Sequence, residues 1–140
     1  MSTLYTATAT ATGEGRAGRA VSDDGQLDLA LAIPAALGGP GGGTNPEQLF
    51  AAGWAACFHS ALRTVARAEK TTLADSSVIA DISLLPDGNG GYKLQAALHV
   101  EIGGMDQAVA EQLVERAHQV CPYSNATRGN IDVVIDTTVG

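Results

Sequence analysis

The sequence predicts an α+β fold in which antiparallel sheets pack on two core helices. One long stretch, residues 44–70, has a helical composition, and the segments before and after it alternate at period two between glycine-rich turns. The predicted order is β-β-β-α-β-β-α-β, and strands joined by short turns pair antiparallel. With 140 residues, the chain is expected to form a single domain, 1–140.

Three strands are predicted before the long helix. Residues 4–12 alternate threonine with small or aromatic residues, and 19–22 form a short return strand after the glycine-rich turn 13–18. In 27–33, leucine and isoleucine recur at period two, which is typical of a half-buried strand. Residues 36–43 contain five glycines and one proline, so this segment is predicted to be a loop.

The long stretch 44–70 is predicted to be one buried helix of about six turns. Thr44 and Asn45 are capping residue types, and Pro46 suits the first helical position. Residues 49–62 carry no charge, so protein must cover most of the circumference of this helix.

After this helix, residues 78–85 and 92–102 are predicted to form a hairpin, because the intervening segment is rich in turn residues. A second helix is predicted over 106–120, ending near Cys121 because Pro122 disfavours helical geometry in the residue before it. Its expected core stripe consists of Val109, Leu113, Ala117 and Val120. A last strand is predicted over 131–139.

Composition limits the classes of partner. The net charge is −7 and the 8 Lys and Arg residues form no run, so neither nucleic acid nor an anionic membrane is an expected partner. No apolar stretch approaches about 18 residues, and the N-terminus shows no secretory pattern, so a cytoplasmic protein is expected. Only 16% of the residues are charged, which favours a further apolar surface at a subunit interface.

The chain has two cysteines, Cys57 and Cys121, which are either inert buried thiols or a redox couple. A reactive thiol inside an apolar helix needs a cation to stabilise its thiolate. Arg16 in the glycine turn is a candidate, with Glu47 to orient it, although composition alone favours the alternative in which the two residues only decorate a turn and a helix end. The three histidines show no ligand spacing, so no metal site is expected.

Two contiguous motifs surround these cysteines. Residues 43–53 read Gly-Thr-Asn-Pro-Glu-Gln-Leu-Phe-Ala-Ala-Gly and are followed by Ala-Cys-Phe at 56–58. Residues 120–131 read Val-Cys-Pro-Tyr-Ser-Asn-Ala-Thr-Arg-Gly-Asn-Ile. Both resemble the cysteine motifs of the organic hydroperoxide resistance proteins of the OsmC/Ohr family, and the likeness extends over nearly the whole chain.

The resemblance implies an OsmC/Ohr-like fold and a thiol-dependent peroxidase that reduces alkyl or lipid hydroperoxides to alcohols without a bound metal, haem or flavin. It assigns Cys57 as the peroxidatic and Cys121 as the resolving cysteine, with Arg16 and Glu47 as the activating pair. The glycine turn is one residue longer than the family pattern and has alanine in place of aspartate, so Arg19 is the alternative to Arg16.

The implied chemistry passes through a sulfenic acid on Cys57 and a Cys57–Cys121 disulfide. The resemblance implies that a dihydrolipoyl group, in dihydrolipoamide or a lipoylated protein, reduces the disulfide. An apolar lining from Phe50, Trp54 or Phe58 would favour organic peroxides over hydrogen peroxide. Two other functions stay open: a hydrophobic-ligand binding module with little turnover, and a stress protein of the neighbouring OsmC branch.

An intertwined homodimer is the last expectation. Glu47 and Cys57 are ten residues apart, which is about 15 Å along one helix. The resemblance nevertheless places both in one site with Arg16. The conflict disappears if Arg16 and Glu47 come from one subunit and the two cysteines from its twin.

Overall fold

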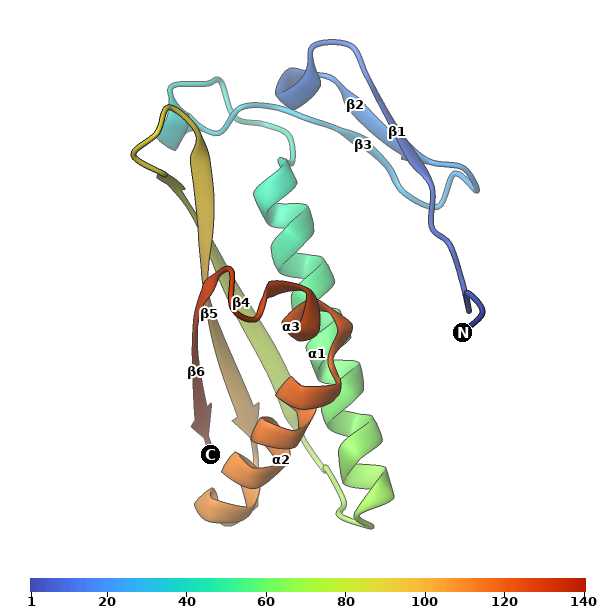
Figure 1. Cartoon of the computed structure of the whole chain (residues 1–140), viewed down its shortest axis with the longest axis vertical. Helices are drawn as coiled ribbons and strands as arrows, with labels where there is room; N and C mark the ends of the chain where they lie inside the picture. The colour runs from blue at the N-terminus through green and yellow to red at the C-terminus, as the bar shows by residue number, and fades with distance from the viewer. The chain divides into compact units, whose positions relative to one another are not determined.

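The computed structural model describes residues 1–140 and confirms the α+β class, with two three-stranded sheets and three α-helices (Figure 1). The chain divides into two compact units, residues 1–49 and 50–140, which are described in turn. The single domain over 1–140 stays a prediction. No helix is long and apolar enough to cross a membrane.

The first unit contains an antiparallel sheet of strands β1 (Ala9–Thr12), β2 (Arg19–Ser22) and β3 (Asp28–Ala30) in that order. β1 is shorter than the predicted strand, because β2 ends at Ser22 and offers partners to only four residues. Gly18 closes the turn between them, because a Cβ there would clash with the carbonyl oxygen of Thr12.

No hydrophobic side chain of residues 1–49 is buried, and Asn45 is the one buried residue in this range. Leu4 and Tyr5 are exposed by 100% and 80%. The sheet of the first unit therefore has no hydrophobic core of its own.

Helix α1 (Pro46–Ala68) confirms the long predicted helix. Pro46 is its first residue, and the Asn45 side chain caps it by accepting a hydrogen bond from the Gln48 backbone N–H at 2.9 Å. One face is buried, through Trp54, Phe58, Ala61, Leu62, Val65 and Ala66. The opposite face, with Ala52, Ala56 and Ser60, is exposed, so the second unit by itself leaves part of the uncharged helix uncovered.

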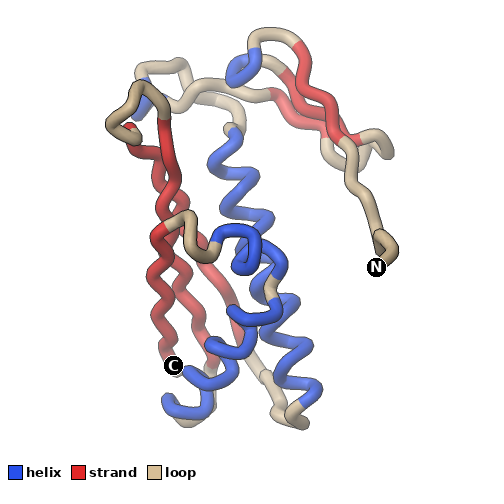
Figure 2. The backbone as a smooth tube through the Cα atoms, viewed as in Figure 1, coloured by secondary structure: helices blue, strands red, loops and turns tan.

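The second sheet has the order β4–β5–β6, from Ser76–Pro86, Tyr92–Ile102 and Asp132–Thr138 (Figure 2). β4 and β5 form the expected antiparallel hairpin, with Ser76 opposite Ile102. One pairing differs from the antiparallel expectation: β6 runs parallel to β5. The helical segment between them is a crossover connection that returns the chain to the start of β5, and such a connection joins parallel strands.

Helix α2 (Gln107–Val120) is preceded by Asp106, whose carboxylate caps it by accepting from the Val109 N–H at 3.3 Å. Its buried residues are Ala110, Leu113, Val114 and Ala117. The predicted core stripe was therefore wrong at Val109 and Val120, which are exposed by 41% and 52%. The true stripe follows i, i+3, i+4 and i+7 and starts one residue later.

A third helix, α3 (Pro122–Thr127), was not predicted. Cys121 separates it from α2 in an extended conformation (φ −68°, ψ 122°), as expected for a residue before proline. Pro122, which ends one helix, also starts the next, because proline suits the first helical position. The short turn at Cys121 thus directs its side chain into the core of the second unit, which is formed mainly by α1, β5 and α2.

Candidate active site

The two cysteines meet inside the second unit. Cys57 lies near the middle of α1 and is partly exposed, whereas Cys121, between α2 and α3, is fully buried. Their sulfur atoms are 3.7 Å apart and both thiols are free. A disulfide needs about 2.0 Å between the sulfurs, so only a small movement would join them.

The surroundings of Cys57 act on its pKa in both directions. Burial is the largest influence and raises the pKa of this thiol, because a thiolate loses solvation in the core. The backbone N–H of Tyr123 donates to the sulfur and lowers the pKa, while the Cys121 thiol raises it. The net pKa is raised, so this unit by itself keeps Cys57 in its protonated, weakly nucleophilic form.

A cation–carboxylate pair is present in the first unit. Arg16 sits in the short 3₁₀ turn Gly15–Ala17, and Glu47 lies in the first turn of α1. The Arg16 Nη1 donates to both carboxylate oxygens of Glu47, at 2.7 and 3.1 Å. The bond to Glu47 raises the pKa of Arg16 further, so the guanidinium stays charged. Arg16 remains 41% exposed, which leaves part of it free to meet another group.

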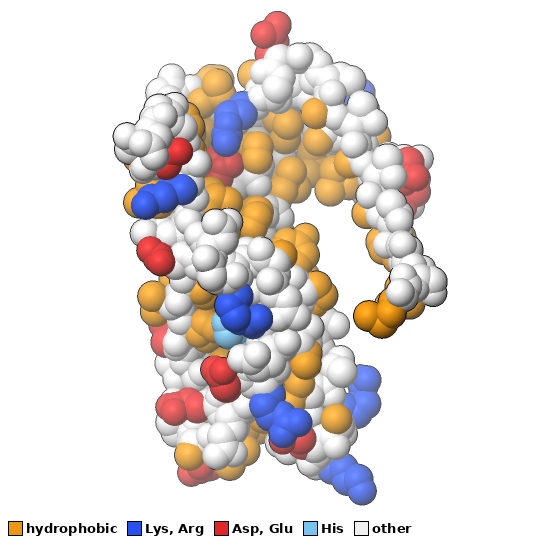
Figure 3. Space-filling view, viewed as in Figure 1, with side chains coloured by type: hydrophobic (Ala, Val, Ile, Leu, Met, Phe, Trp, Pro, Cys, Tyr) orange, Lys and Arg blue, Asp and Glu red, His pale blue; other side chains and the backbone are white.

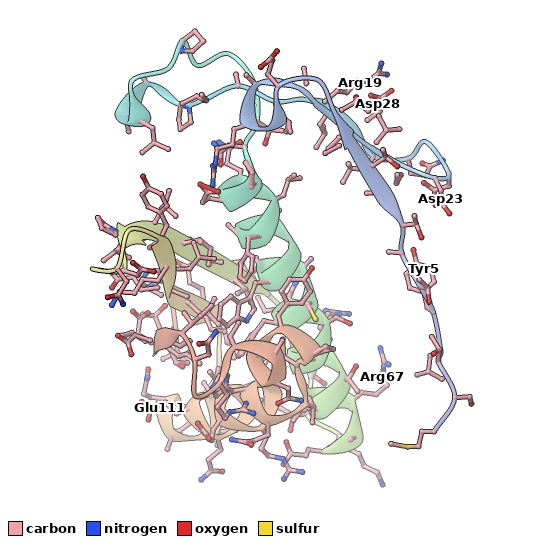
Figure 4. All side chains as sticks on the ribbon, turned by 45° about the horizontal axis from the view of Figure 1, so that its top comes forward. Tyr5, Arg19, Asp23, Asp28, Arg67 and Glu111 are labelled. Atoms are coloured by element: carbon pink, nitrogen blue, oxygen red, sulfur yellow. The ribbon has the colours of Figure 1, made fainter.

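Arg19, the alternative to Arg16, has a different partner. Its guanidinium forms two hydrogen bonds to Asp28 on the neighbouring strand, at 2.7 and 2.6 Å, and the two side chains lie together in Figure 4. Such a bidentate pair fixes the guanidinium on β2 and β3. The structure therefore pairs Glu47 with Arg16 rather than with Arg19.

The aromatic residues near Cys57 divide into core and accessible groups. Trp54 and Phe58 are fully buried, so they belong to the core and do not line an open pocket, in contrast to the sequence-based expectation. Phe50 and Tyr123 are partly exposed and meet edge to face, with ring centroids 6.0 Å apart. These two rings therefore offer accessible apolar surface to a ligand.

Sequence reasoning missed the contribution of α3. The Tyr123 N–H at the sulfur and the buried Ser124 hydroxyl beside Trp54 both depend on a helix that begins right after Cys121. The signal available in the sequence was Pro122, which fits the first position of a new helix as well as the end of the preceding one.

No group of three or more side chains could hold a metal ion. His59 bonds to Ser76, and His99 lies between Asp81 and Asp136 on the exposed face of the second sheet. On the face shown in Figure 3, Lys and Arg side chains lie among acidic ones and do not gather into one patch.

The family follows from comparison with known proteins. The profile of the family described as OsmC-like protein matches residues 39–136, which include both cysteines. The chain belongs to the OsmC/Ohr family. Residues 39–136 extend from the glycine-rich loop through α1 to β6, so the match covers the second unit almost entirely and includes Glu47 from the first.

Individual OsmC/Ohr relatives match over nearly their full length. The chain is 56% identical to the "Organic hydroperoxide resistance protein" of Xanthomonas axonopodis pv. citri (strain 306), covering 94% of this chain and 93% of the relative. Identity is 48% to "Organic hydroperoxide resistance protein OhrB" of Bacillus subtilis (strain 168), covering 95% and 97%. The crystal structure of an organic hydroperoxide resistance protein from Legionella pneumophila superposes with a TM-score of 0.95 at 54% identity, covering 99% of this chain and all of that one.

Proposed function

We propose that this OsmC/Ohr chain is a dithiol peroxidase that reduces organic hydroperoxides to alcohols. The observation that carries the proposal is the 3.7 Å separation of the Cys57 and Cys121 sulfurs, in a chain whose relatives are named for organic hydroperoxide resistance. Two free thiols at this distance can carry out a two-electron reduction without a metal or an organic cofactor.

In the first step, the Cys57 thiolate attacks the outer oxygen of the hydroperoxide. The O–O bond breaks, Cys57 becomes a sulfenic acid, and the alkoxide takes a proton and leaves as the alcohol. The Tyr123 N–H at the Cys57 sulfur stabilises the thiolate, and the Phe50 and Tyr123 rings offer apolar surface to an alkyl chain. Hydrogen peroxide has no such chain, so organic peroxides are the preferred substrates.

In the second step, the Cys121 thiol attacks the sulfur of the Cys57 sulfenic acid. The S–O bond breaks, water leaves, and a Cys57–Cys121 disulfide forms. Because the two sulfurs are already close, this step competes with further oxidation of Cys57 to sulfinic acid. A dihydrolipoyl group, in dihydrolipoamide or a lipoylated protein, then returns both cysteines to thiols by donating two electrons through its own pair of thiols.

Activation of Cys57 is assigned to Arg16, oriented by Glu47. The raised pKa of Cys57 requires a cation, and the Arg16 guanidinium is charged, held by a carboxylate and partly exposed. Its charge stabilises the thiolate and the negative charge that develops on the leaving oxygen.

The complete site is proposed to form in a homodimer. Glu47 precedes Cys57 by about 15 Å along α1, so the activating pair of one subunit is assigned to the cysteines of its twin. Two observations support a dimer: residues 1–49 bury no hydrophobic side chain, and the face of α1 with Ala52, Ala56 and Ser60 is exposed. Both surfaces gain cover from a second copy. The cytoplasm is the proposed location, because it keeps both cysteines reduced between turnovers.

The test is a peroxidase assay with catalytic amounts of protein, in which oxidation of dihydrolipoamide is followed with cumene hydroperoxide or hydrogen peroxide as oxidant. We expect rapid turnover with cumene hydroperoxide, slower turnover with hydrogen peroxide, and none in Cys57→Ser. Binding of hydrophobic compounds without turnover would instead support the binding-module function. A preference for hydrogen peroxide would support a general stress protein of the OsmC branch.

A further inference from the structure

Helix α1 and the segment 121–124 at the start of α3 are joined by two contacts with the same spacing. Trp54 and Cys57 are three residues apart on α1, and Cys121 and Ser124 are three residues apart around the start of α3. The Cys57 and Cys121 sulfurs lie 3.7 Å apart, and the Trp54 Nε1–H donates to the Ser124 Oγ at 3.3 Å. Residues three apart lie on the same face of a helix, so the hydrogen bond runs beside the pair of thiols.

The hydrogen bond is isolated from solvent. Trp54 and Ser124 are both fully buried, and the indole N–H has the Ser124 hydroxyl as its partner. An indole nitrogen can only donate, and a buried donor without an acceptor is costly. A shift of α3 away from α1 would therefore break this bond and leave the indole N–H without its acceptor.

A close approach beside the bond supports the same alignment. Gly53 faces the Tyr123 side chain so closely that a Cβ on Gly53 would lie 2.7 Å from the Tyr123 hydroxyl oxygen. Phe50 packs edge to face on both Trp54 and Tyr123. Positions 50, 53, 54 and 57 share one face of α1 and all contact the segment that follows α2, and these contacts together hold Cys121 opposite Cys57.

We propose that Trp54 and Ser124 are positioning residues that hold Cys121 within reach of Cys57 and so set the rate and equilibrium of disulfide closure. The proposal deepens the dithiol function and rests on it for its role in turnover. In the closing reaction, the S–O bond of the Cys57 sulfenic acid breaks, the S–S bond forms, and water leaves. Loss of the hydrogen bond leaves this chemistry intact but lowers the effective concentration of Cys121 at Cys57.

The experiment measures the disulfide equilibrium with glutathione, in which protein dithiol plus glutathione disulfide gives protein disulfide plus two glutathiones. The variants are Ser124→Ala, Trp54→Phe and the double variant. Thr127→Val is the matched control, because Thr127 is also buried on α3 but its hydroxyl bonds only to the Tyr123 and Ser124 carbonyls of the same helix. The free energy of unfolding of each reduced variant is measured in parallel.

Each single variant is expected to lower the equilibrium constant for disulfide formation about tenfold, the factor that corresponds to one hydrogen bond. The double variant should match the single ones in this constant, because the bond is already lost. It should nevertheless regain stability over Ser124→Ala, since no indole N–H is left without an acceptor. In Thr127→Val, the equilibrium constant for disulfide formation should stay within about twofold of the wild-type value, which is well below the tenfold change expected from loss of the bond.

Equilibrium constants within about twofold of the wild type in both Ser124→Ala and Trp54→Phe would overturn the proposal, since one hydrogen bond corresponds to about tenfold. The proposal would also be overturned if Thr127→Val lowered the equilibrium constant for disulfide formation as much as Ser124→Ala does. The same holds if the double variant regained both this constant and the free energy of unfolding. Either result would show that the variants act only through the stability of the fold. The assay contains no peroxide. An inactive wild-type protein in the peroxidase assay would therefore contradict the proposed function while leaving this result readable on its own.

Discussion

The sulfur atoms of Cys57 and Cys121 lie 3.7 Å apart although 64 positions separate the two residues in the chain. Cys57 is held by α1, and Cys121 is the extended residue that precedes Pro122 between α2 and α3. A resolving thiol this close can trap a sulfenic acid before a second peroxide reaches it.

Treatment of the reduced protein with less than one equivalent of tert-butyl hydroperoxide should produce an intramolecular Cys57–Cys121 disulfide. Peptide mass spectrometry without reduction is the measurement. Cys57→Ser should abolish turnover, whereas Cys121→Ser should react once and then accumulate sulfenic or sulfinic acid on Cys57. If only links between chains are found, or none, the assignment of Cys121 as the resolving cysteine is wrong.

Arg16→Ala should raise the pKa of Cys57 and slow peroxide attack by about 10²–10³, as for a lost oxyanion donor. Glu47→Ala should slow it by less, because the charge remains but its orientation is lost. Stopped-flow measurement of the first step across pH gives both the rate and the thiol pKa. Arg19→Ala is the matched control, since Arg19 bonds to Asp28 instead, and should leave the rate unchanged. A severe loss in Arg19→Ala with a mild one in Arg16→Ala would reverse the assignment.

Heterodimers formed from two inactive variants, Cys57→Ser and Arg16→Ala, should be active. Cys57→Ser chains lack the nucleophile and Arg16→Ala chains lack the activating cation, so a heterodimer has one intact site if each site combines two subunits. The two variants are unfolded and refolded together, and heterodimers are counted by native mass spectrometry with one parent isotope-labelled. A mixture that contains heterodimers but stays as inactive as its parents would place each site within one chain.

His99 should make the stability of the second unit depend on pH. Hydrogen bonds that His99 donates to Asp81, the larger influence, and to Asp136 raise the pKa of this histidine above its ordinary 6.5. The stabilisation is therefore fully present below the unfolded pKa of 6.5 and is lost as the pH rises through the higher folded value. The effect should be small, because exposed ion pairs contribute little.

The measurement for His99 is urea unfolding at about pH 6 and about pH 9, on either side of the titration of a histidine whose pKa is raised. The free energy of unfolding should fall more from the lower to the higher pH in the wild type than in His99→Gln. The Asp81→Asn/Asp136→Asn variant is a second comparison, since it keeps the imidazole but removes both carboxylates, and it should behave like His99→Gln. Equal pH dependence in all three proteins would show that the cluster does not couple to folding.

The sequence alone determined the elements whose signals are local. Pro46 and Asn45 set the start of α1, Pro122 set the end of α2, and the Tyr92–Ile102 strand follows from period-two alternation after a turn-rich loop. The two cysteine motifs were equally local, because each is a contiguous run, and so the OsmC/Ohr family was recognisable from the sequence.

Only the tertiary structure decided which residues meet. The parallel pairing of β6 with β5 and the contacts of Trp54 with Ser124 and of Cys57 with Cys121 all join segments far apart in the chain. Local patterns fix the period of a strand or the end of a helix, but direction, register and burial depend on packing against distant residues. For the same reason the sequence assigned Trp54 to a pocket lining, whereas the core encloses it completely.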